Sequence, residues 1–106
     1  MTTIREAQHK VVEFRDKVLP PDLTFSKQFG KFLEETAEFY KAHQKDHRVE
    51  LVDGLGDTLY VLLGLANLSG VDLETAFDRI HESNMTKTRD GSLSPKGLGF
   101  KPPELT

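Results

Sequence analysis

The chain has 106 residues, which is enough for about one small domain. Apolar residues make up 37% of it and charged residues 29%, which excludes a fibre and a wholly disordered chain. It has no cysteine, which excludes disulfides and thiolate metal sites, and its net charge of −3 argues against broad nucleic-acid binding. Its longest apolar run, residues 59–66, is much shorter than the roughly 20 residues that cross a bilayer. We therefore expect a soluble cytoplasmic protein that binds neither nucleic acid nor a membrane.

Four helices are predicted in chain order, over about residues 4–19, 24–45, 49–69 and 72–84. The first starts behind the capping-box pattern Thr3-Ile4-Arg5-Glu6 and ends at Pro20-Pro21. The third ends at Gly70, which suits a left-handed C-terminal position, and Asp72 is the expected N-cap of the fourth. The second carries an apolar stripe at intervals of three and four residues, which consists of Phe25, Phe29, Phe32, Leu33, Thr36 and Tyr40.

The third predicted helix has two contrasting faces. One face is apolar and contains Leu51, Leu55, Leu59, Leu62 and Ala66. The opposite face starts with acidic residues and continues into Tyr60, Val61 and Gly64. We expect both faces to be buried and this helix to be central.

The C-terminal part of the chain has a different character. No strand-like alternation precedes residue 86, and turn signals are dense from residue 88 onward. We predict an all-α fold, an antiparallel four-helix bundle over residues 1–87, with a loop-rich, basic Gly/Pro tail at 88–106 that belongs to the same domain.

Carboxylates gather on the second and third helices. Residues 49–78 contain six acidic residues and no Lys or Arg, and Glu50, Asp53 and Asp57 fall within about 60° of one another on a helix. Such like charges oppose one another's ionisation unless a cation compensates them. Together with a second acidic group, Glu34, Glu35 and Glu38, they would form an all-oxygen site of the kind that Mg²⁺ or Mn²⁺ prefers.

A simpler interpretation applies to the acidic residues of the second helix. Glu34, Glu35 and Glu38 could form a solvated surface with Lys31 and Lys41 as ion-pair partners. For Asp53 and Asp57, which lie in an apolar helix without a basic neighbour in sequence, we favour the functional interpretation.

Several segments resemble the all-α nucleotide pyrophosphohydrolases. Residues 34–38, EETAE, and 53–61, DGLGDTLYV, resemble the paired ExxE and ExxD helices of that superfamily. Residues 77–87, FDRIHESNMTK, together with DG at 90–91, PKG at 95–97 and FKPP at 100–103, resemble its MazG-like, phosphoribosyl-ATP-pyrophosphohydrolase-like branch. The match spans nearly the whole chain in the family's order.

The resemblance assigns roles to individual residues. It implies that Glu35, Glu38 and Asp57 hold Mg²⁺ and that Glu34 acts on the attacking water. The family glutamate three residues before Asp57 is Gly54 here, so Asp53 is expected as the substitute ligand. Glu50 is the reserve ligand.

Four more residues are substrate-binding candidates. Asn84 and Lys87 match positions that face the active site in this branch, and as an alternative they cap the fourth helix. Lys96 is a further candidate for neutralising the pyrophosphate. Tyr60 could stack on a base, or it could belong to the core.

The implied reaction is Mg²⁺-dependent hydrolysis of a nucleoside triphosphate between its α and β phosphates, in nucleotide-pool housekeeping. Two alternatives remain, phosphoribosyl-ATP hydrolysis and a non-catalytic helical oligomer that binds nucleotide or metal. Four short helices with exposed phenylalanines make a thin core, and members of the family assemble, so a homodimer or homotetramer is expected.

Overall fold

The computed structural model describes residues 1–87 and 101–105, and these residues form two compact units, Met1–Val71 and Asp72–Thr106. The described residues contain four α-helices and no strand, which confirms the all-α prediction. None of these helices is long and apolar enough to cross a membrane. The turns predicted between residues 88 and 100 lie outside the described residues.

The helix boundaries follow the local signals in the sequence. The helices are α1 (Ile4–Val18), α2 (Phe25–Gln44), α3 (Arg48–Leu68) and α4 (Leu73–Asn84). Thr3 and Glu6 form the predicted capping box, and Asp72 accepts a hydrogen bond from the backbone of Glu74. Thr24 caps α2 through the backbone N–H of Lys27. Gly70 has φ of 68°, the left-handed conformation predicted there.

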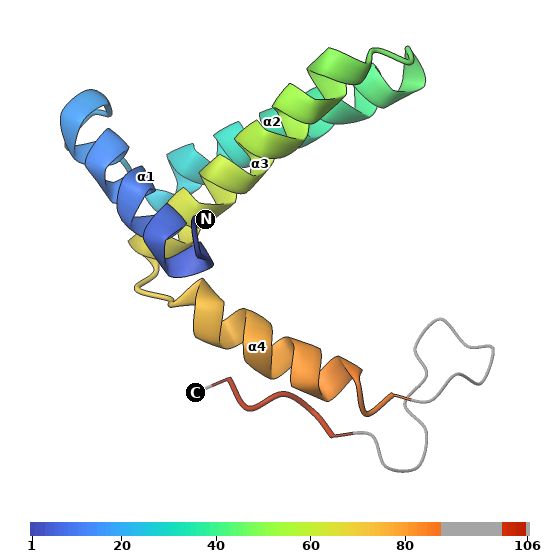
Figure 1. Cartoon of the computed structure of the whole chain (residues 1–106). Coiled ribbons are helices and arrows are strands. Elements are labelled where there is room, and N and C mark those ends of the chain that lie inside the picture. The colour runs from blue at the N-terminus through green and yellow to red at the C-terminus, as the bar shows by residue number, and fades with distance from the viewer. Residues whose placement is uncertain (88–100, 106) are drawn as a thin grey trace. The chain divides into compact units, whose positions relative to one another are not determined.

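Helix α3 is the central element of the first unit, as expected, because it packs against both α1 and α2. Figure 1 shows α2 and α3 side by side, joined by the short connection at residues 45–47. Such a short connection makes the two helices antiparallel. The predicted end of the second helix, at about residue 45, and the predicted start of the third, at about 49, each differ by one residue from the structure, where α2 ends at Gln44 and α3 begins at Arg48.

The start of α1 is fastened to the end of α3 by buried polar groups. The Gln8 side-chain amide donates to Asn67 Oδ1 at 3.2 Å and to the Val71 carbonyl at 2.8 Å. In return, the Asn67 amide donates to the Gln8 carbonyl at 3.0 Å. These bonds satisfy groups that would otherwise be costly to bury, and they fix the position of α1 on α3.

The core of the first unit draws most of its residues from the C-terminal half of α3. Its buried apolar residues are Val11, Ala42, Val61, Leu63, Leu65 and Ala66. On the predicted apolar face of α3, Ala66 is buried, whereas Leu55 is 50% exposed, Leu59 54% and Leu62 40%. Within the first unit, the expectation that both faces of this helix are buried is therefore wrong for the stretch from Leu55 to Leu62, because α1 and α2 leave the apolar face uncovered there.

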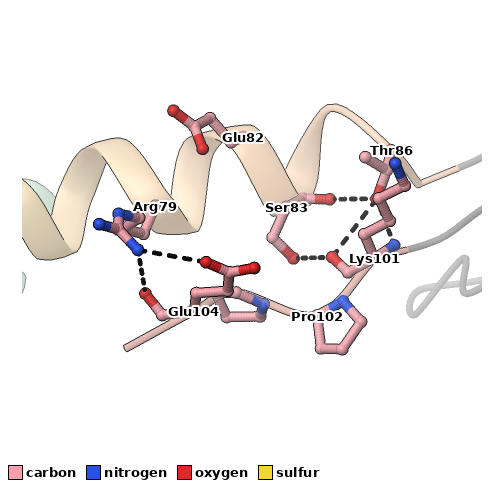
Figure 2. Close-up of a pocket in the computed structure, with 8 residues that line it drawn as sticks. Arg79, Glu82, Ser83, Thr86, Lys101, Pro102 and Glu104 are labelled. Atoms are coloured by element: carbon pink, nitrogen blue, oxygen red, sulfur yellow. Dashed lines mark hydrogen bonds and ion pairs between the residues drawn. The ribbon is translucent and has the colours of Figure 1, made fainter. Parts of the chain in front are cut away.

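The second unit pairs α4 with the described C-terminal residues (Figure 2). The Ser83 hydroxyl donates to the Lys101 carbonyl, and the Lys101 N–H donates to Thr86 Oγ1 at 2.7 Å. One turn earlier, Arg79 lies 3.4 Å from the Glu104 carboxylate. Side chains of α4 thus hold the extended segment 101–105 along the helix.

Candidate active site

The acidic segment of α2 starts with an ion pair. Lys31 and Glu35 are one turn apart, and Lys31 Nζ lies 3.0 Å from Glu35 Oε1 and 3.8 Å from Glu34 Oε2. The pKa of Lys31 is raised, first by its hydrogen bond to Glu35 and then by the charge of Glu34. The salt-bridged interpretation is thus correct for Lys31, but the Glu35 side chain is only 9% exposed, so it is not a solvated surface group.

Asp57 of α3 is the acidic residue whose environment is most informative. Its pKa is raised, first by desolvation and then by the charges of Asp53 and Glu35, while Lys31 opposes the shift. The structure therefore places Asp57 close enough to Glu35 for the two carboxylates to repel each other across the α2–α3 contact.

A pocket of about 390 Å³ in the first unit is lined by both charged and apolar residues. Its charged lining residues are Lys31, Glu35 and Asp57, and its amide is Gln28. Its apolar lining consists of Val11, Phe14, Leu19, Tyr60 and Val61. The rings of Phe14 and Tyr60 meet edge to face with centroids 5.6 Å apart. One pocket therefore offers ionic groups together with an aromatic wall.

Gly54 lies where α3 comes close to the backbone of α2. A Cβ atom at this position would stand 2.5 Å from Phe39 Cβ and 3.1 Å from Phe39 Cα. Such a contact with the backbone cannot be relieved by a side-chain rotation. In this chain the position of the family glutamate is thus a packing position, which leaves no space for a carboxylate ligand.

The other predicted ligands lie at or beyond the margin of the pocket. Glu38 and Asp53 are both exposed. The charge of Glu38 nevertheless contributes to the raised pKa of Lys31, and the charge of Asp53 contributes to the raised pKa of Asp57. The reserve residue Glu50 lies 3.2 Å from His47 Nδ1 at the start of α3. Among residues 1–87 and 101–105, no three acidic or histidine side chains are arranged so that they could share a metal ion.

The remaining candidates divide between the two units. Tyr60 lines the pocket, as a substrate-binding role requires. Asn84 and Lys87 belong to the second unit, and Lys96 lies outside the described residues. The proposed roles of these three residues in binding phosphate stay predictions.

Six pocket residues were not selected as site candidates from the sequence, and Phe14, Gln28 and Lys31 are the aromatic and polar ones among them. Gln28 carried a usable signal, because it lies three residues after Phe25 and four before Phe32 and so falls on the apolar stripe of α2. Phe14 and Lys31 carried none, because their proximity to Asp57 depends on how the three helices pack.

The fold and this site define an all-α protein with carboxylates on two antiparallel helices at one pocket. The family model for phosphoribosyl-ATP pyrophosphohydrolase matches residues 4–84, and the chain belongs to this family. It is accordingly a nucleotide pyrophosphohydrolase, a hydrolase that acts on phosphoric anhydrides. No curated protein and no solved structure matches the chain.

Proposed function

We propose that this protein hydrolyses nucleoside triphosphates between the α and β phosphates, releasing a nucleoside monophosphate and pyrophosphate, with Mg²⁺ as cofactor and Mn²⁺ as a substitute. The observation that carries the proposal is the meeting of Glu35 and Asp57 in a pocket that also has an aromatic wall. Ionic groups suit the metal–phosphate part of the substrate, and aromatic rings suit its base.

The chemistry of the pocket fits a divalent cation. Its acidic donors are carboxylate oxygens, and the pKa of Asp57 is raised by desolvation and by the charges of Asp53 and Glu35, against the opposing effect of Lys31. Glu35 and Asp57 would hold the cation, with Glu38 and Asp53 one turn away on their helices. When bound, Mg²⁺ neutralises phosphate charge and lowers the pKa of coordinated water.

The chain's own residues have separate tasks in this proposal. Glu34, whose side chain is exposed beside Lys31, accepts the proton of the attacking water. The water oxygen forms the new bond to the α phosphorus, and the bond from that phosphorus to the bridging oxygen breaks. Tyr60 and Phe14 bind the base, and binding of phosphate by Asn84, Lys87 and Lys96 stays a prediction from the sequence.

Phosphoribosyl-ATP is the second candidate substrate, and the family match favours it. It presents the same type of phosphoric anhydride, so it belongs in the same assay. We favour nucleoside triphosphates of the nucleotide pool as substrates, because Gly54 replaces the family glutamate and the tail is rich in Gly and Pro.

We further propose that the protein acts as a homodimer or homotetramer. The support is the apolar face of α3 that α1 and α2 leave exposed.

The deciding experiment is pyrophosphate release from a panel of triphosphates, including dUTP, dCTP and phosphoribosyl-ATP, with Mg²⁺ and with Mn²⁺. We expect metal-dependent turnover by the wild type and its loss in Asp57→Asn, with helical content by circular dichroism nearly unchanged. Full activity of Asp57→Asn would reject this site. Saturable nucleotide binding without any turnover would instead indicate a non-catalytic binder.

A further inference from the structure

Gln28 is a buried amide in a pocket that otherwise offers charged and apolar groups. It lies on α2 and is only 9% exposed, and it is the single amide among the described residues that line the pocket. Glutamine is mostly an exposed residue, so a buried glutamine at a pocket calls for an explanation.

The Gln28 side chain is held in place by α3. Its Nε2 atom donates to the Val61 carbonyl at 3.4 Å, and a Cβ atom at Gly64 would stand only 2.6 Å from the same Nε2. The absence of a side chain at Gly64 is thus what makes room for the amide. One N–H hydrogen is used by Val61, which leaves the second hydrogen and the carbonyl oxygen for a ligand in the pocket.

The position of Gln28 along α2 suits the base rather than the phosphates. It precedes Glu35 by seven residues, which corresponds to two helical turns and about 10.5 Å along the axis. Glu35 and Asp57 mark the ionic part of the pocket, and the ring pair of Phe14 and Tyr60 lies among its apolar residues. A nucleotide with its phosphates at the carboxylates would extend its base toward the amide.

We propose that Gln28 is a specificity residue, which binds the hydrogen-bonding edge of a nucleobase that lies against Phe14 and Tyr60. The inference rests on the proposed function. An amide presents a donor and an acceptor side by side, and the nucleobases differ in the order in which their edges carry the complementary pair. An aromatic wall accepts all bases alike, so discrimination requires such a polar group.

The direct test is Gln28→Met, which keeps the approximate shape of the side chain and removes both hydrogen-bonding groups. Calorimetry with a set of nucleoside monophosphates measures how far dissociation constants differ among bases, and ribose 5-phosphate serves as the probe without a base. We expect wild-type differences of about ten- to a hundredfold to collapse to a few-fold, with ribose 5-phosphate binding unchanged. Unchanged ratios among the bases would overturn the proposal, as would a wild type that shows no preference or binds no nucleotide.

Two further variants separate a specific role from general loosening of the protein. Gly64→Ala displaces the amide of Gln28 without altering its chemistry, and we expect it to reduce the ratios among bases as well. Gln8→Met removes another buried amide, whose bonds go to Asn67 and Val71 instead of the pocket, and we expect wild-type ratios. A collapse of the ratios in Gln8→Met equal to that in Gln28→Met would contradict the assignment.

Failure of this inference can be told apart from failure of the proposed function. Turnover of the triphosphate panel tests the reaction, whereas monophosphate binding tests Gln28 without any chemistry. If the protein turns over triphosphates but the ratios of dissociation constants among bases are unchanged in Gln28→Met, only the inference about Gln28 is rejected. If binding is base-selective and depends on Gln28 but no triphosphate is turned over, only the proposed reaction is rejected.

Discussion

Gly54 shows how a single residue can separate this chain from the motif that it resembles. The space that a family glutamate would need is occupied by Phe39, whose Cβ and Cα atoms would lie 2.5 and 3.1 Å from an added Cβ. A metal ligand at position 54 is thus incompatible with the observed α2–α3 contact. Asp53, the preceding residue, stays the predicted substitute ligand.

We predict that Gly54→Ala destabilises the protein by about 1–3 kcal/mol, since overpacking against backbone forces the two helices apart. Urea denaturation measures the change. Gly56→Ala is the matched control, because an added Cβ there meets nothing within 4 Å, and alanine favours a helix by roughly 1 kcal/mol over glycine. A Gly54→Ala protein as stable as Gly56→Ala would refute the contact.

The raised pKa of Asp57 predicts a pH dependence of stability. Partial desolvation and the charges of Asp53 and Glu35 make the native state hold the Asp57 proton more tightly than the unfolded state. The contribution of Asp57 to the free energy of unfolding therefore falls as pH rises from its unfolded pKa, about 3.9, through its raised native pKa.

Asp57→Asn removes this dependence, so we expect the variant to gain stability relative to the wild type as pH rises across that window. Urea denaturation of both proteins between about pH 3.5 and about pH 7 covers it. A stability difference that stays constant with pH would contradict the raised pKa.

At the scale of elements, specific hydrogen bonds join α4 to the C-terminal segment (Figure 2). Ser83 and Thr86 contact the backbone of Lys101, and Arg79 contacts both the carbonyl and the carboxylate of Glu104. Because these bonds pair side chains with backbone groups, a small number of hydroxyls controls the position of the segment.

Thr86→Val removes the acceptor of the Lys101 N–H. We expect hydrogen exchange at the Lys101 amide to accelerate by roughly two- to tenfold, the usual effect of one such bond. Nuclear magnetic resonance detects this amide individually. Thr75→Val is the control, because that hydroxyl donates to Asp72 at the other end of α4, and exchange at Lys101 should then match the wild type.

At the scale of the whole molecule, the main feature is the apolar face of α3 that α1 and α2 leave exposed. Val52, Leu55, Leu59 and Leu62 follow one another at intervals of three and four residues and are each at least 40% exposed. A continuous apolar stripe of this kind is typical of a helix that packs against another molecule.

We predict that Leu59→Lys converts the proposed homo-oligomer to a monomer, because it places a charge in the apolar stripe. Light scattering coupled to size-exclusion chromatography gives the mass. Val18→Lys changes an equally exposed apolar residue on α1 and should keep the wild-type mass. A monomeric wild type, or loss of assembly in Val18→Lys as well, would count against the stripe as the interface.

The sequence by itself determined the four helices, their ends and the identity of the acidic residues. Capping by Thr3 and Asp72 and the left-handed Gly70 depend on residues a few positions apart, so local chemistry is enough to predict them. Only the tertiary structure decided that Gln28, Lys31 and Phe14 join Asp57 at one pocket and that Gly54 is a contact residue. These relations depend on which faces of three helices meet, and that is set by packing between residues far apart in the chain.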